Sequence, residues 1–182
     1  GGRNVTLNDT GAIQFTTSTI SGNLTVTANG AITETGPINV TGTTTLTAGS
    51  ANAIELNNFG NNFGGAVSVV SGRDVTLSDT SGIVLGDAVI SGNLSVYAVG
   101  NITSSGNLTV AGGSSLTATT FVPGSLPLAG GSSLRLGVVA GSNGLLQPIA
   151  VVPVSHIPPS ASITLAGAND FAGAVSVSAT GN

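Results

Sequence analysis

The sequence predicts an all-β fold, a right-handed parallel β-helix (β-solenoid) with about 20 to 24 residues and three short strands in each coil. Three observations predict it. The chain repeats itself at a period of 70 residues, short apolar pairs recur in strict alternation, and Gly, Thr, Ser and Asn are abundant. The period indicates a repeat architecture, and the alternation indicates strands. The small polar residues suit tight corners and exposed strand positions.

The 70-residue period is visible as recurring strings. The string GRNVTL at residues 2–7 returns as GRDVTL at residues 72–77. When residues 2–48 are aligned with residues 72–118 without a gap, 24 of the 47 pairs are identical. Self-similarity of this strength indicates stacked structural units, and each repeat is expected to hold about three coils.

The second copy is longer than the first. Residues 53–56 correspond to residues 162–165, and residues 63–69 correspond to residues 171–177. The offset between the copies therefore grows from 70 to 108 or 109. The additional residues fall at about 119–160.

These correspondences predict a single continuous solenoid in three parts. Residues 1–70 form the first repeat, residues 71–118 with 161–182 form the second repeat and the start of the next, and residues 119–160 form an insert. Both ends of the sequence fall at repeat junctions, so we expect a fragment of a longer chain.

Short strands are predicted wherever an apolar residue is followed two positions later by another. Leu24 and Ile32 begin such pairs 19 residues after Val5 and Ile13, which indicates the length of one coil. The pairs are rich in β-branched residues and are bounded by Gly, Asn, Asp and Ser. They include Val5/Leu7, Ile13/Phe15, Leu24/Val26, Ile38/Val40, Ile54/Leu56, Val67/Val69 and Val75/Leu77.

Charge and composition exclude several classes of function. Three Arg, no Lys and a net charge of −4 argue against nucleic acid and against anionic membrane surfaces. The sequence has no uninterrupted apolar run of about 18 residues, so we expect no membrane insertion. The absence of Cys excludes disulfides and thiolate metal sites. We predict no cofactor and no metal site.

Three segments carry a resemblance to a known family. Residues 21–33, 40–49 and 62–69 are similar to the repeats of filamentous-haemagglutinin-like exoproteins, which are large bacterial surface adhesins of the two-partner secretion type. The resemblance covers residues 1–118 and about 161–182. It implies a right-handed parallel β-helix that is exported through an outer-membrane partner and holds a binding tip away from the cell. No signal peptide is present in the sequence, so an extracellular or cell-surface location rests on this resemblance alone.

The expected function is therefore a non-enzymatic structural stalk segment of an extracellular adhesin or surface filament. Its expected partners are neighbouring repeats of the same chain, end-to-end copies, or a host or matrix glycan or protein. An unpaired sheet edge at either end of a solenoid invites another chain. Segments that stack end to end as a fibre are thus a lesser alternative.

A carbohydrate-active parallel β-helix enzyme, or a glycan-binding module, is the main alternative. Such enzymes need clustered carboxylates beside Arg or Lys in a groove. Asp74 and Asp79 with Arg73 are the one candidate cluster, but the first copy has Asn4 in place of Asp74. We therefore predict no catalytic residues.

The acids that recur in both copies are predicted to form structural ion pairs at corners. Asp9 and Asp79 share the 70-residue offset, as do Arg3 and Arg73. The predicted pairs are Arg3 with Asp9 and Arg73 with Asp79, each of modest energetic value at a surface.

The insert at residues 119–160 departs from the repeat pattern. It holds six of the seven Pro residues, which cannot donate to a sheet ladder, so it is either a side excursion or two irregular coils. His156 has no second His or Cys with which to share a metal, and we expect it to be exposed beside a Pro corner. Apolar residues of the insert form a candidate partner-binding surface: Phe121, Leu126, Leu128, Leu134, Leu136, Leu145, Leu146, Ile149, Val151 and Val152.

Several Asn residues lie in Asn-x-Ser/Thr triplets. Each precedes or lies within a predicted strand, so we interpret them as corner residues whose amides stack between coils. Glycosylation is the alternative. The triplets begin at Asn4, Asn23, Asn39, Asn93 and Asn101.

Overall fold

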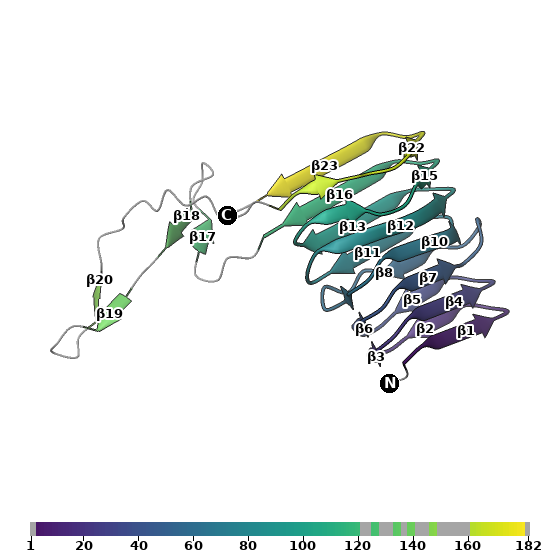
Figure 1. The fold of residues 1–182 in the computed structure, drawn as a ribbon, viewed down its shortest axis with the longest axis horizontal. Coiled ribbons are helices and arrows are strands. Elements are labelled where there is room, and N and C mark those ends of the chain that lie inside the picture. The colour runs from purple at the N-terminus through teal and green to yellow at the C-terminus, as the bar shows by residue number, and fades with distance from the viewer. Residues whose placement is uncertain are drawn as a thin grey trace.

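The computed structural model is a stack of parallel β-strands that form a β-solenoid, as the sequence predicts (Figure 1). It describes residues 3–120 and 161–180, together with the backbone of four short strands between residues 125 and 148. Every strand pair in the stack is parallel, and the described residues contain no helix. Accordingly, the described part of the chain has no helix long and apolar enough to cross a bilayer.

Two sheets run along the whole stack, and a third covers only its first three coils. The nine-stranded sheet contains β1 (Val5–Asp9), β4 (Leu24–Ala28), β7 (Thr44–Thr47), β10 (Val67–Gly72), β12 (Ile83–Ile90), β14 (Ile102–Ser104), β15 (Leu108–Val110), β21 (Ile163–Thr164) and β22 (Asp170–Phe171). The seven-stranded sheet contains β2 (Ile13–Phe15), β5 (Ile32–Glu34), β8 (Ile54–Leu56), β11 (Val75–Asp79), β13 (Leu94–Val99), β16 (Ser114–Thr119) and β23 (Val175–Thr180). The three-stranded sheet contains β3 (Ser18–Ile20), β6 (Ile38–Val40) and β9 (Asn62–Phe63).

The first three coils have three strands each, in agreement with the sequence pattern. Successive partners in the nine-stranded sheet are Val5, Leu24, Thr44 and Val67, so the coils are 19, 20 and 23 residues long. These lengths fall close to the predicted range. Corner length accounts for the variation, because β1, β4 and β7 pair without a shift in register and β10 follows β7 in register as far as Val69.

The 70-residue repeat is not a whole number of coils, which corrects the expected three coils per repeat. Val5 lies in the nine-stranded sheet, whereas its repeat equivalent Val75 pairs with Ile54 in the seven-stranded sheet. The three coils from Val5 to Val67 are followed by one further strand before Val75 is reached. Equivalent segments of the two copies therefore lie in neighbouring sheets.

The core is a narrow column of inward side chains from the stacked strands β2 to β16, with partly buried residues of β1, β21 and β22 packed against it. Alternate strand residues point inward because successive side chains of a strand face opposite sides. Removing one such Leu or Ile from water stabilises the fold by about 1.5 to 3 kcal/mol. The largest fully buried side chains are Phe63, Leu24, Ile32, Ile38, Leu46, Ile54, Leu56, Leu77, Ile83, Ile90, Ile102 and Leu108.

Glycines stack where the chain turns before the long strands of the second copy. A Cβ atom on Gly112 would lie 2.5 Å from the carbonyl oxygen of Gly92, and one on Gly92 would lie 2.8 Å from that of Arg73. No larger residue fits at these positions unless the backbone shifts. The close approach allows the N–H of Gly112 to donate to Gly92 and that of Gly92 to donate to Arg73.

The coils before and after the insert stack directly on each other. β16 pairs with β23 along six residues, from Ser114 with Val175 to Thr119 with Thr180. No coil lies between these two strands. Within the insert, β17 (Ser125–Pro127) pairs antiparallel with β18 (Ser133–Arg135), and β19 (Val138–Ala140) pairs antiparallel with β20 (Leu146–Pro148).

Candidate functional site

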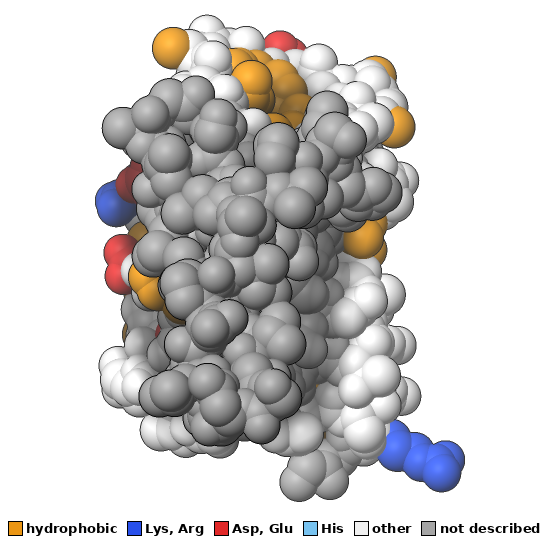
Figure 2. All heavy atoms as spheres, turned by 90° about the vertical axis from the view of Figure 1, so that its left-hand side faces the viewer, with side chains coloured by type: hydrophobic (Ala, Val, Ile, Leu, Met, Phe, Trp, Pro, Cys, Tyr) orange, Lys and Arg blue, Asp and Glu red, His pale blue; other side chains and the backbone are white. Residues whose placement is uncertain are grey.

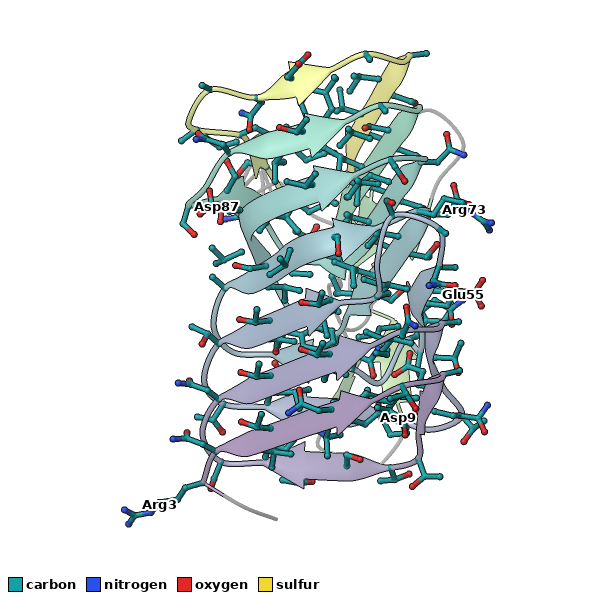
Figure 3. The ribbon with its side chains drawn as sticks, turned by 90° about the vertical axis from the view of Figure 1, so that its right-hand side faces the viewer. Arg3, Asp9, Glu55, Arg73 and Asp87 are labelled. Atoms are coloured by element: carbon teal, nitrogen blue, oxygen red, sulfur yellow. The ribbon has the colours of Figure 1, made fainter. Side chains whose placement is uncertain are left out.

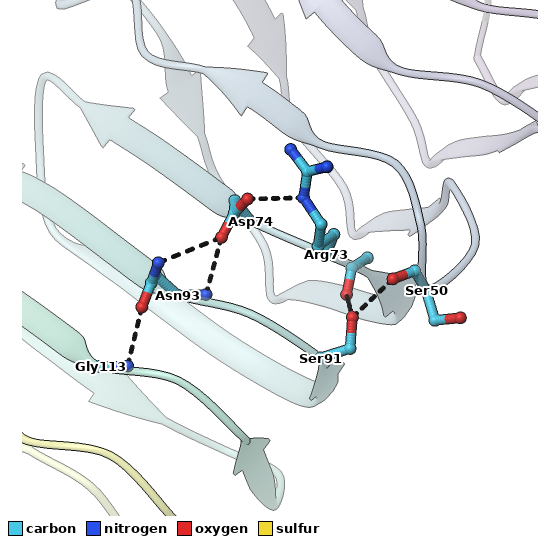
Figure 4. Close-up of polar contacts among 7 residues, drawn as sticks. Ser50, Arg73, Asp74, Ser91, Asn93 and Gly113 are labelled. Atoms are coloured by element: carbon cyan, nitrogen blue, oxygen red, sulfur yellow. Dashed lines mark hydrogen bonds and ion pairs between the residues drawn. The ribbon is translucent and has the colours of Figure 1, made fainter.

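The candidate cluster around Asp74 is a hydrogen-bonded ladder that joins three coils (Figure 4). One Asp74 carboxylate oxygen, Oδ1, accepts from the backbone N of Asn93 at 3.0 Å and from its Nδ2 at 3.2 Å. Asn93 Oδ1 in turn accepts from the backbone N of Gly113 at 2.9 Å. We call such a chain of contacts from coil to coil a corner ladder. The one formed by Asp74, Asn93 and Gly113 lies in the second copy of the repeat and is the second corner ladder. The side chains of Asp74 and Asn93 accept hydrogen bonds from the backbone N–H groups of Asn93 and Gly113, which lie just outside the strands.

Asp74 is held in its ionised form. The N–H of Asn93 and the guanidinium of Arg73, whose Nε lies 2.7 Å from Asp74 Oδ2, lower the pKa of this exposed carboxyl below its ordinary value. A lowered pKa favours an ion-pairing role and works against general acid catalysis at neutral pH. These contacts tie Asp74 into the corner of the stack.

Asp79 lies apart from this cluster and is buried. Its Oδ2 accepts from the backbone N of Phe63 at 2.7 Å, and its Oδ1 accepts from the backbone N of Ser81 at 2.6 Å and from the Ser81 hydroxyl at 2.8 Å. Both carboxylate oxygens therefore satisfy groups of the fold itself. The structure does not form the predicted pair of Arg73 with Asp79, because Arg73 pairs with Asp74 instead.

Arg3 and Asp9 are likewise well apart, and they form no ion pair with each other in the described part of the chain (Figure 3). The physical reason is the strand between them. β1 (Val5–Asp9) is extended at about 3.3 Å per residue, so six positions of separation exceed the reach of both side chains. The same reason separates Arg73 from Asp79. Asp9 accepts from the backbone N of Gly11 at 2.6 Å instead.

The Asn residues of the glycosylation triplets act as acceptors between coils. The Oδ1 atoms of Asn4, Asn23 and Asn101 accept from backbone N–H groups of the next coil at 2.9, 3.0 and 2.9 Å, as Asn93 does in the second corner ladder. Asn39 lies in the middle of β6 and is partly buried. Four of the five Asn residues thus link two coils, but through bonds from backbone N–H groups and not through the predicted stacking of amide on amide.

An aromatic pair lies on the side of the stack, with Phe59 exposed and Tyr97 partly buried. Phe59, in the loop after β8, is 70% exposed, and its ring contacts Tyr97 of β13 edge to face at 5.2 Å between centroids. The loop is held by Glu34, whose Oε1 accepts from the backbone N of Asn58 at 2.6 Å and from Asn61 Nδ2 at 2.8 Å. The sequence analysis did not single out this pair, because its members are far apart in the chain and both face outward.

The two ends of the stack expose apolar surface. At the β1 end, a hollow of about 450 Å³ is lined by Val5, Leu7 and residues 14–20. At the β23 end, hydrophobic side chains are visible (Figure 2), and Val175 and Val177 are exposed. Each end also presents strands with one unpaired edge among the residues that the structure describes.

The candidate partner surface of the insert lies outside the residues whose side chains are described. This applies to His156 and to all ten apolar residues that the sequence analysis names there. Among the described residues, no group of three or more His, Cys, Asp or Glu side chains could hold a metal ion.

Parallel coils joined by corner ladders define the chain as a β-solenoid repeat protein. The chain matches the model of the family described as "Repeats of unknown function (DUF5649)" twice, over residues 2–70 and over residues 72–123. The chain belongs to this family. The first match covers the first copy of the 70-residue repeat, and the second covers the second copy only as far as the first residues of the insert. Neither the comparison with curated proteins nor that with solved structures finds a match.

Proposed function

We propose that this chain is a non-enzymatic stalk segment of a bacterial extracellular adhesin or surface filament. The observation that carries the proposal is the continuous parallel pairing from β1 to β23. Each coil contacts its neighbours through sheet hydrogen bonds, a shared apolar column and corner ladders, so length increases by one strand spacing per coil. Such a stack supplies rigid length, which is what a stalk requires.

The roles of the acidic residues support this proposal over a carbohydrate-active enzyme. Asp79 uses both carboxylate oxygens to accept from backbone N–H groups, and Asp74 is tied to Arg73 and Asn93. A glycosidase needs a pair of carboxylates that flank the glycosidic bond that is cleaved. A screen for polysaccharide cleavage tests the alternative. Activity that is lost in both Asp79→Asn and Asp74→Asn variants would establish the enzyme.

The stalk proposal is tested by adding length. A further copy of residues 2–71, inserted between residues 71 and 72, should add three coils and one strand to the stack. At about 4.8 Å per coil, the maximum dimension measured by small-angle X-ray scattering of the monomer should grow by about 15 Å while the cross-section stays constant. An increase in cross-section without an increase in length would contradict the proposal.

A glycan-binding module is a second candidate, favoured by the exposed ring of Phe59, which packs against the partly buried ring of Tyr97. Exposed aromatic rings offer apolar faces to sugar C–H groups, and Thr119 Oγ1 lies 3.3 Å from the Tyr97 hydroxyl as a neighbouring polar contact. A glycan array would compare the wild type with Phe59→Ala, with exposed Val70→Ala as the control. Binding that disappears in Phe59→Ala alone would assign the site, whereas loss on deletion of residues 119–160 would assign it to the insert.

A further inference from the structure

We propose that the loop between β8 and β9 presents the ring of Phe59 as a binding site for neutral glycans, in which one sugar ring stacks on the aromatic ring. The inference rests on the second candidate of the proposed function, a glycan-binding module, and names its ligand class and the residue that positions the ring. It follows from the differences between the two copies of the repeat, because Glu34, Phe59 and Tyr97 each depart from the repeat and meet at this loop.

The loop differs between the copies although its anchor does not. Asn61 and its equivalent Asn169 each accept a hydrogen bond from a backbone N–H of the preceding coil, at 2.8 and 3.0 Å. The five residues 57–61 read NNFGN, whereas the four residues 166–169 read AGAN and include no aromatic residue. Because the second copy closes the same corner without a ring, the corner itself does not require Phe59.

Glu34 holds the loop at a cost in free energy. Its Oε1 accepts from the backbone N of Asn58 at 2.6 Å and from Asn61 Nδ2 at 2.8 Å, while its Oε2 is buried and has no hydrogen-bond partner among the described residues. A buried polar oxygen without a partner is destabilising. The equivalent Ser104 avoids this cost by donating to the carbonyl oxygen of Ala166 at 2.7 Å. Since exceptions of this kind concentrate at functional sites, we interpret Glu34 as a positioning residue for the loop.

Tyr97 supports the ring from a later coil. β8 pairs with β11, and β11 pairs with β13, so the loop reaches across one coil to bring Phe59 against Tyr97. The equivalent of Tyr97 in the first copy is Thr27, which has no ring. Phe59 stays 70% exposed despite this contact. A ring that is restrained before a ligand arrives loses little conformational freedom on binding, which favours affinity.

The surroundings of the ring favour a sugar over a protein partner. Val70 and Val89, the other exposed large hydrophobic side chains outside β23 in the described part of the chain, lie in the nine-stranded sheet. Protein interfaces depend on a cluster of apolar and aromatic anchors, which Phe59 alone does not supply. The outward neighbours of the ring pair in β13 and β16 carry hydroxyl groups, at Ser95 and Thr117. One aromatic face beside hydroxyl groups matches the C–H face and the hydroxyl rim of a sugar ring.

The charges near the ring favour a neutral glycan. The loop and the strands β8, β11, β13 and β16 contain no Lys, Arg or His, and they contribute the exposed acid Glu55 and the buried acid Asp79. Of the two described Arg residues, Arg3 lies in the first coil and Arg73 pairs with Asp74. A uronate or a sulfated sugar would therefore find no cation at this site and would be repelled by Glu55.

Proton NMR of the whole chain tests the site, because Tyr97 is the single Tyr of the sequence and its ring signals identify themselves. Short neutral oligomers of glucose, galactose, mannose and N-acetylglucosamine are titrated separately. Oligomers of the corresponding uronates are the matched anionic probes, since they carry a carboxylate in place of a CH2OH group. At least one neutral oligomer should shift the Tyr97 signals until saturation, and its uronate counterpart should bind about tenfold more weakly or not at all.

Variants separate the ring from the residue that positions it. Phe59→Leu keeps an apolar side chain without the ring and should weaken binding of the neutral oligomer about tenfold. Glu34→Ser introduces the residue of the second copy and should weaken binding although the ring is present, whereas Glu34→Gln keeps an oxygen acceptor for Asn58 and should restore it. Val89→Ala, at an exposed position of the nine-stranded sheet, is the control and should bind as the wild type does. Circular dichroism checks that each variant keeps its β structure.

The proposal would be overturned if no neutral oligomer shifts the Tyr97 signals, if Phe59→Leu binds as tightly as the wild type, or if the uronates bind more tightly than the neutral oligomers. Unchanged binding in Glu34→Ser would overturn the positioning role of Glu34. Glycan-array binding without a shift of the Tyr97 signals would place the glycan-binding candidate on another surface. The stalk proposal is tested separately, by the length of the monomer.

Discussion

The two copies of the repeat place the same aspartate in two environments. Asp9 ends β1, is exposed, and accepts from the N–H of Gly11 and from no other group among the residues that the structure describes. Asp79 ends β11, is 1% exposed, and accepts from the N–H groups of Phe63 and Ser81. The flanking sequences are nearly identical. The difference arises because β11 lies on a preceding coil, whereas β1 begins the described stack.

The contacts of a residue in a solenoid thus depend on the residues at the same place in the preceding and following coils. In a globular domain, equivalent local sequences usually meet unrelated partners. In this stack the partner is another copy of the same pattern, so the environment of a side chain changes mainly with its distance from an end. Substitutions at matched positions of the two copies can therefore measure what stacking contributes.

The largest difference is expected for the aspartates themselves. Asp79→Ala leaves the buried N–H of Phe63 without an acceptor and should lower the free energy of unfolding by about 2 to 3 kcal/mol. Asp9→Ala should change it by about 0.5 kcal/mol or less in dilute solution. Urea unfolding followed by circular dichroism measures both. Equal effects would show that the buried contacts of Asp79 contribute nothing to stability.

Glycine substitutions should give the next largest contrast. Gly112→Ala brings a methyl group against the carbonyl oxygen of Gly92 and should destabilise the fold by about 1 to 3 kcal/mol through overpacking. Gly11 lies at a corner of the first coil, where an added Cβ meets its nearest neighbour, Asp9 Oδ1, at an ordinary 3.4 Å. Gly11→Ala should be close to neutral. Thermal unfolding of both variants measures the difference. A neutral Gly112→Ala would contradict the close stacking of corners.

The corner ladders should differ by a smaller amount. Asn93→Ala removes the acceptor for the N–H of Gly113 and the donor to Asp74, at an expected cost of about 0.5 to 1.5 kcal/mol. Asn23→Ala removes only the acceptor for Thr43, so its cost should be lower. Urea unfolding midpoints of the two variants provide the comparison, provided that the dependence of the unfolding free energy on urea concentration (the m-value) is the same in both. If Asn23→Ala costs as much, the bond from Asn93 to Asp74 has no net value.

The smallest expected effect is the pH dependence of stability at the corner that holds Asp74. Hydrogen bonds from Asn93 and Arg73 lower the pKa of Asp74 in the folded state. The stabilisation is therefore complete above the pKa of the unfolded chain, about 3.9, and is lost as the pH falls through the lower folded value. Asn4 occupies the equivalent position and does not titrate. Carboxyl NMR titration should show the pKa of Asp74 rise in Arg73→Ala, and no rise would remove Arg73 from this account.

The alternating apolar pairs were sufficient to predict the class of fold. Val5/Leu7 and Val75/Leu77 read as strands in both copies, and both pairs lie in parallel sheets. The spacing from Val5 to Leu24 also predicted the length of the first coil. Local pattern carries this information because inward and outward residues alternate in every strand.

The pattern could not predict which sheet a strand joins or what its corners contact. The pairs at residues 5–7 and 75–77 have the same alternation, yet they lie in different sheets, because corner length decides how far the chain travels around the coil. Pairing Arg73 with Asp79 from sequence ignored the length of the strand between them. The contact of Phe59 with Tyr97 depends on two outward side chains from different coils, and no local signal marks it.

The shift of equivalent strands into the neighbouring sheet has a consequence for what such a protein can display. The loop at Phe59 joins β8 to β9, whereas the equivalent connection in the second copy joins β21 to β22 in another sheet. A loop that occurs once per repeat therefore points in a different direction in each of the two copies. An array in which this shift recurred would present such loops on all sides of the solenoid, so a partner could bind them from any side.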